Sequence, residues 1–78
     1  MTILFHRHFD KQYAKLSAGI KRHFEERLSL FVCVPFDPLL GNHALHDRFA
    51  GYRSISITGD VRAIYKALNE ETVEFALI

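Results

Sequence analysis

The spacing of the hydrophobic residues changes near the middle of the chain, and this change constrains the fold more than any other feature. Four large hydrophobic residues before the change recur every three or four positions: Ile20, Phe24, Leu28 and Phe31. This spacing predicts one buried stripe along a helix. Pro35 and Pro38 follow and would end that helix. The second half of the chain alternates residue by residue instead, as strands do.

The start of the chain adds a strand and a first helix. Residues 2–5 are β-branched, aliphatic and aromatic, which predicts a short opening strand. From about Arg7 the spacing becomes helical, with Phe9 and Tyr13 on one side, until Ser17 and Gly19 interrupt it. We therefore expect a two-helix hairpin that covers one face of a sheet.

Three segments of the second half are predicted to form that sheet: residues 52–58, 61–68 and 72–78. Gly59-Asp60 predicts a two-residue hairpin turn of type II′. With that turn, Arg62 would lie opposite Ile57 and Lys66 opposite Arg53. The expected fold class is α+β: an N-terminal strand and a two-helix hairpin packed on an antiparallel-rich sheet.

Length and composition indicate one small domain, residues 1–78, with a thin hydrophobic core. Cys33 is the only cysteine, so the chain forms no internal disulfide, and we interpret this residue as a small core hydrophobe. With no signal peptide or long apolar run, the composition predicts a cytoplasmic protein. The formal net charge of +1 does not indicate a nucleic-acid binder, so any such function would need local clustering of cations.

Cations do recur through the predicted sheet. Arg53, Arg62 and Lys66 would share one face, and Arg48 comes shortly before the first of these strands. Converging cations bind phosphate, and arginine does so with two parallel hydrogen bonds. The alternative is an ordinary solvated sheet edge, with long side chains lying over apolar neighbours.

Two histidines, His43 and His46, lie between the helices and the sheet. A loop histidine on a rigid scaffold is a candidate acid or base because it titrates near neutrality. Their spacing alone does not complete a zinc site, so we expect no metal. Asp60 is either a carboxylate that orients a histidine or simply a residue that suits a turn.

Four segments resemble one protein family in the same order along the chain: HFDKQYAKL, FEERLSLF, DPLLGNHAL and GYRSISITGDVRAIYK. Together they resemble the RelE superfamily of bacterial toxins, most nearly its YafQ-type branch. The resemblance implies a compact antiparallel-rich sheet with a helical hairpin packed on it. It also implies a ribosome-dependent endoribonuclease that cuts messenger RNA and is held inactive by a cognate antitoxin.

The resemblance also implies roles for particular residues. His43, Asp60 and Arg62 match the family's catalytic positions, where the RNA's own 2′-hydroxyl is the nucleophile. His43 and Asp60 would transfer or orient protons, and Arg62 would stabilise the charge on the phosphate. The remaining cations, Arg48, Arg53 and Lys66, would contact the RNA. No metal or other cofactor is implied.

Three departures from the family pattern predict weak or absent cleavage. Ser56 stands where relatives carry Asn or His, and Val61 replaces a tryptophan. The sequence also ends at Ile78, before the family's Gly-Thr-His segment, and we expect an incomplete last strand with an unpaired edge. The alternatives are a non-catalytic toxin that still binds antitoxin and a gyrase-inhibiting toxin of the ParE type. His43 and the Gly-Asp turn favour the RNase over the ParE type.

Overall fold

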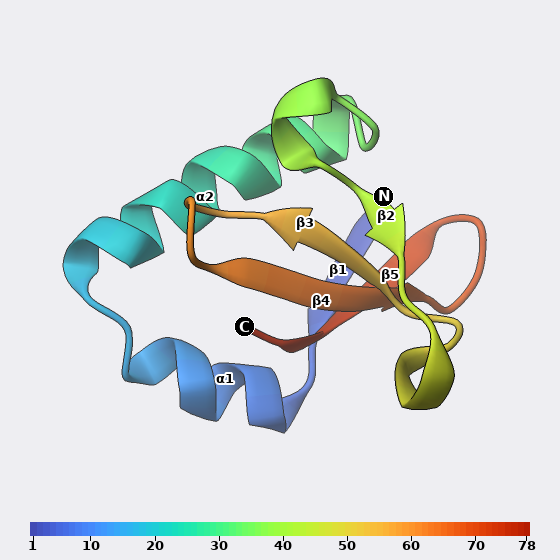
Figure 1. Cartoon of the computed structure of the whole chain (residues 1–78), viewed down its shortest axis with the longest axis horizontal. Coiled ribbons are helices and arrows are strands. Elements are labelled where there is room, and N and C mark those ends of the chain that lie inside the picture. Colours follow the sequence, from blue (N-terminus) through green and yellow to red (C-terminus); the bar gives the residue numbers. More distant parts are fainter.

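A computed structural model describes the whole chain, residues 1–78, as a five-stranded sheet with two helices packed against it (Figure 1). The elements confirm the expected α+β class. In chain order they are β1 (Thr2–Phe5), α1 (Arg7–Ala14), α2 (Ala18–Cys33), the 3₁₀ turn η1 (Pro38–Leu40), β2 (His43–Ala44), the 3₁₀ turn η2 (Asp47–Phe49), β3 (Arg53–Ser56), β4 (Arg62–Ala67) and β5 (Thr72–Leu77).

Local side-chain contacts set where the two helices begin. The Nδ1 atom of His6 accepts a hydrogen bond from the backbone of His8 and caps α1. The hydroxyl of Ser17 accepts one from the backbone of Ile20, 3.2 Å away, and caps α2. Each cap satisfies a backbone N–H that has no partner within its helix. The interruption seen in the sequence is thus the start of the second helix.

The strand order is β1-β5-β4-β3-β2. β1 pairs with β5 in parallel, and every other pair is antiparallel. The last strand, β5, therefore lies inside the sheet, hydrogen-bonded on both sides. Our expectation that it leaves an unpaired edge is wrong, because the N-terminal strand occupies that side; the free edges belong to β1 and β2.

The core lies between the helices and one face of the sheet, and Phe75 of β5 is at its centre. Its ring is fully buried and has its centroid within 6.0 Å of five other aromatic rings: Phe5, Phe9, Phe24, Phe31 and Tyr65. Phe24 and Phe31 come from the predicted stripe of α2, which confirms that stripe as the face that packs on the sheet. Aromatic side chains let so short a chain bury a continuous core.

The β3–β4 connection differs from the predicted two-residue turn. Gly59 does not have a positive φ, as a type II′ turn would need. Instead, the Thr58 hydroxyl accepts hydrogen bonds from the backbone of Asp60 and Val61 and closes a longer loop. The Thr58 hydroxyl therefore stabilises this loop, and the loop does not need a glycine with a positive φ.

The longer loop shifts the pairing of β3 and β4 by one residue from the predicted register. Arg62 lies opposite Ser56, and Arg53 lies opposite Tyr65. Because side chains alternate between faces, this shift moves Arg53 to the helix-covered face, whereas Arg62 and Lys66 stay on the other face. The prediction that all three cations share a face is wrong; the face opposite the helices is called the open face below.

Cys33 is exposed at the end of α2, so its interpretation as a core residue is wrong. The α2 stripe has already turned away from the sheet there, and Val32 and Val34 beside it are about half exposed. None of the helices combines the length and the apolar character that crossing a membrane requires.

Candidate functional site

His43 and Arg62 meet on the open face of the sheet, and Ser54 lies between them. His43 of β2 pairs with Ser54 of β3, and Arg62 enters from β4 opposite Ser56. The Arg62 Nε donates to the buried Ser54 hydroxyl at 2.6 Å, and its Nη2 lies 3.3 Å from the His43 Nδ1. Three neighbouring strands thus place an imidazole against a guanidinium. This contact is the part of the predicted site that the structure brings together.

The carbonyl of Gly41 orients both groups. It accepts a hydrogen bond from the Arg62 Nη2 at 2.7 Å and lies 3.0 Å from the His43 Nδ1. Because a carbonyl only accepts, the shorter His43 contact favours the tautomer with the proton on Nδ1 and the lone pair on Nε2 over the one that would accept from Arg62. Gly41 adopts the left-handed conformation, with φ +52°, which suits glycine. Arg62 Nη1 makes no hydrogen bond within the chain.

Asn42 fastens this loop to the body of the protein. Its Nδ2 donates to the carbonyl of Pro35 at 2.9 Å and to the Tyr65 hydroxyl at 2.8 Å, and its Oδ1 accepts from the Arg53 Nε at 2.8 Å. Arg53 also lies over the ring of Phe36, 5.2 Å from its centroid. The structure therefore gives Arg53 a contact that holds the loop in place, on the face away from Arg62.

Asp60 lies at the exposed tip of the β3–β4 loop. Its backbone N–H donates to the Thr58 hydroxyl, and no hydrogen bond or ion pair joins its carboxylate to His43 or Arg62. The geometry matches that of a turn residue. The structure does not connect Asp60 to the other two predicted catalytic groups.

Arg48 and Lys66 belong to a second cluster on the open face. The Arg48 guanidinium lies 5.4 Å from the centroid of Phe49, and the Lys66 ammonium lies 5.4 Å from the centroid of Tyr52. Both distances are typical of cation–π contacts. The two remaining predicted RNA contacts thus sit beside aromatic rings supplied by η2 and the residues just after it.

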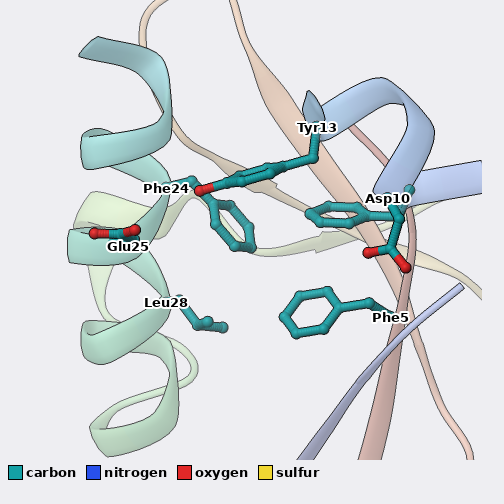
Figure 2. Close-up of a pocket in the computed structure, with 7 residues that line it drawn as sticks. Phe5, Asp10, Tyr13, Phe24, Glu25 and Leu28 are labelled. Carbon is teal, nitrogen blue, oxygen red and sulfur yellow. The ribbon is translucent and has the colours of Figure 1, made fainter. Parts of the chain in front are cut away.

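A separate groove of about 240 Å³ opens between β1, α1 and α2 on the helical side (Figure 2). Its walls are aromatic and aliphatic, with Asp10 and Glu25 at the rim. Burial, and then the charge of Glu25, raises the pKa of the Tyr13 hydroxyl in this groove. No histidine or arginine lines it, so acid–base chemistry on a phosphate does not belong there.

Sequence reasoning missed Gly41, Asn42 and Ser54. Gly41 and Asn42 stand next to His43 in the sequence, and a Gly-Asn pair is a signal for a special turn conformation. Ser54 carried no signal, because a serine in an alternating strand is usually a solvent-facing residue. Only the register shows that its hydroxyl is buried under Arg62.

No model of a known protein family matches the chain, and neither does any curated protein. Solved structures do match. A YoeB/ParE toxin from Agrobacterium tumefaciens superposes with a TM-score of 0.82 at 20% identity, over 99% of this chain and 94% of that one. YafQ from E. coli strain BL21(DE3) gives 0.77 at 22% identity, over 96% and 87% of the two chains.

A third solved structure is YoeB from Staphylococcus aureus, in a heterotetrameric toxin–antitoxin complex with YefM. It gives a TM-score of 0.79 at 16% identity, over 99% of this chain and 92% of that one. At such identities the likeness establishes the arrangement of the chain rather than its chemistry. The resemblance found in the sequence is confirmed at that level: this chain has the fold of the RelE-like, YoeB- and YafQ-type toxins.

Proposed function

We propose that the chain is the toxin of a toxin–antitoxin pair and that its target is messenger RNA on the ribosome. The observation that carries this proposal is the contact between His43 and Arg62, whose Nη1 makes no hydrogen bond within the chain. A base beside a cation is what cleavage of RNA by its own 2′-hydroxyl needs. The fold shared with known toxins supports the same conclusion.

The proposed reaction starts when the His43 Nε2 takes the proton of the 2′-hydroxyl. The 2′-oxygen then bonds to phosphorus, the bond from phosphorus to the 5′-oxygen breaks, and a 2′,3′-cyclic phosphate forms. Arg62 stabilises the charge that builds up on the phosphate oxygens, using its Nη1. The departing 5′-oxygen takes its proton from solvent water, because the structure pairs no second acid with His43. Lack of such an acid typically lowers the rate about 10²- to 10⁴-fold, so we expect slow cleavage.

The experiment is primer extension on a translated message incubated with ribosomes and the purified chain. We expect weak cleavage that is lost in His43→Gln and reduced in Arg62→Lys, which keeps the charge but loses the bidentate geometry. Asp60→Asn is the matched control, because the structure leaves that carboxylate unconnected. Cleavage that survives in His43→Gln would contradict the proposed mechanism.

A second candidate is a non-catalytic toxin that binds its antitoxin without cutting RNA. The absence of an acid paired with His43 favours this reading, and the Staphylococcus aureus neighbour is seen in complex with an antitoxin. Co-purification with the product of an adjacent antitoxin gene, without cleavage by the free chain, would support it. Inhibition of DNA gyrase would instead support the ParE-type alternative.

A further inference from the structure

A second hollow, of about 330 Å³, lies on the open face of the sheet. Its lining includes His6 and His8, at the junction of β1 and α1. Phe49 and Tyr52, from η2 and the residues after it, also line it, as does Glu74 of β5. Neither histidine was a candidate in the sequence, because they flank or lie on a helix, away from the loop that carries His43.

The sheet topology explains why these distant segments meet. β5 lies between β1 and β4, and the backbone N–H of His6 donates to the carbonyl of Phe75 at 2.9 Å. This bond sets the two histidines beside Glu74, the next residue back along β5. In the register of β4 and β5, Glu74 lies opposite Lys66, whose ammonium lies over the ring of Tyr52. One face thus runs without interruption from the histidines to the aromatic pair.

The lining combines flat rings with positive charge. The centroids of Phe49 and Tyr52 are 6.2 Å apart and their planes are nearly perpendicular, and those of His6 and His8 are 4.7 Å apart in the same arrangement. Arg48 lines the hollow, and Lys66 borders it over the Tyr52 ring. Aromatic rings beside cations are the usual platform for unpaired bases and their phosphates. The Glu74 carboxylate among them can accept a hydrogen bond from an exocyclic amino group.

We propose that this hollow is a subsite for one unpaired base of the RNA strand, a proposal that rests on the function proposed above. Arg62 and Lys66 project from the same face of β4 and are four residues apart, or about 13 Å along the strand. A short single-stranded segment bound at His43 and Arg62 reaches the hollow across that face. The base stacks on the face of one of the two rings, Phe49 or Tyr52, and contacts the edge of the other, while Arg48 and Lys66 hold its phosphate.

The test measures binding of a fluorescein-labelled, unstructured RNA oligonucleotide by anisotropy at fixed low salt. Removing the aromatic faces with Phe49→Leu and Tyr52→Leu is expected to weaken binding about tenfold each. Phe36→Leu is the matched control, because Phe36 is an exposed aromatic residue beside Arg53 on the other side of the sheet. Tyr52→Phe keeps the ring and is expected to bind as the unmodified chain does.

The outcomes separate this proposal from the one it rests on. Binding by the unmodified chain that Phe49→Leu and Tyr52→Leu leave unchanged would overturn the subsite and leave the RNA target standing. An unmodified chain that does not bind the free oligonucleotide would overturn the subsite, whereas the ribosome-dependent target stands or falls with the primer-extension experiment. If circular dichroism shows that either leucine variant unfolds, two other variants decide the question. Loss of RNA affinity in Arg48→Gln and an altered preference among the four bases in Glu74→Gln would support the subsite. No change in either variant would reject it.

Discussion

Replacing Asn42 by alanine is the sharpest test of how the loop that carries His43 is held. The amide makes three hydrogen bonds, to the carbonyl of Pro35, the hydroxyl of Tyr65 and the Nε of Arg53. No other side chain connects the loop to the end of α2, to β3 and to β4 at once. We therefore expect Asn42→Ala to lower the stability of the whole domain as well as to loosen the site.

The size of the effect follows from these partners. A neutral hydrogen bond contributes about 1 kcal/mol and one with a charged partner about 1.5–3 kcal/mol. Arg53 is partly exposed, so water replaces much of its bond when the amide is removed. Tyr65 is only 4% exposed, so its hydroxyl loses a donor that water does not readily replace. The free energy of unfolding should fall by about 2–3 kcal/mol.

The assay is thermal unfolding followed by far-ultraviolet circular dichroism. For a domain of this length, each kcal/mol corresponds to roughly 4–8 °C, so the midpoint should fall by about 8–24 °C. Asn69→Ala is the matched control, since the only other asparagine accepts a single bond, from the backbone of Glu71 in an exposed turn. Its midpoint should fall by less than about 5 °C.

A result in which the two alanine variants unfold at the same temperature would refute this account of the loop. It would mean that the amide of Asn42 merely exchanges protein partners for water. A large fall in the unfolding midpoint of Asn42→Ala with unchanged RNA binding would support the role of Asn42 in stability. It would also show that RNA binding does not depend on this loop contact.

The remaining predictions concern the core, the groove and the loop glycine. Phe75→Ala should cost roughly 3–5 kcal/mol, most of the stability of a small domain, and leave the chain largely unfolded by circular dichroism. Burial, and then Glu25, raises the pKa of Tyr13, so the stability that the neutral hydroxyl contributes is complete below pH 10.0 and is lost as the pH rises through the pKa of the folded state. Tyr13→Phe should therefore lose less stability than the parent in urea titrations at alkaline pH. Equal losses of stability in the two proteins at alkaline pH would contradict this prediction. Gly41→Ala places a side chain on a residue in the left-handed conformation and should lower the free energy of unfolding in urea by about 1–2 kcal/mol. Gly59→Ala is the control and should lower it little, because Gly59 has no positive φ and has open space around it. Equal urea midpoints for the two variants would rule out the conformation described for Gly41.

Much of the fold could be predicted because it rests on local patterns. The helical stripe through Phe24 and Phe31 is local, and it determines which side of α2 packs on the sheet. Four of the five strands were predicted to within two residues for the same reason, but the two-residue strand β2, in the segment taken as a loop, was not predicted. The turn between β3 and β4 could not be predicted, since Thr58 and Gly59-Asp60 offer competing local solutions and the sequence does not show which has the lower free energy.

The site depended on that turn. A shift of one residue in register exchanges the faces of a strand, so it separated Arg53 from Arg62 and placed Ser54 beneath Arg62. The meeting of His6 with Glu74 likewise depends on β1 entering the sheet beside β5, a pairing between the two ends of the chain. The sequence by itself determined the two helices, four of the five strands, the stripe that forms the core and the candidate histidine. Only the tertiary structure decided which charged groups share a face, because that follows from long-range pairing and not from spacing along the chain.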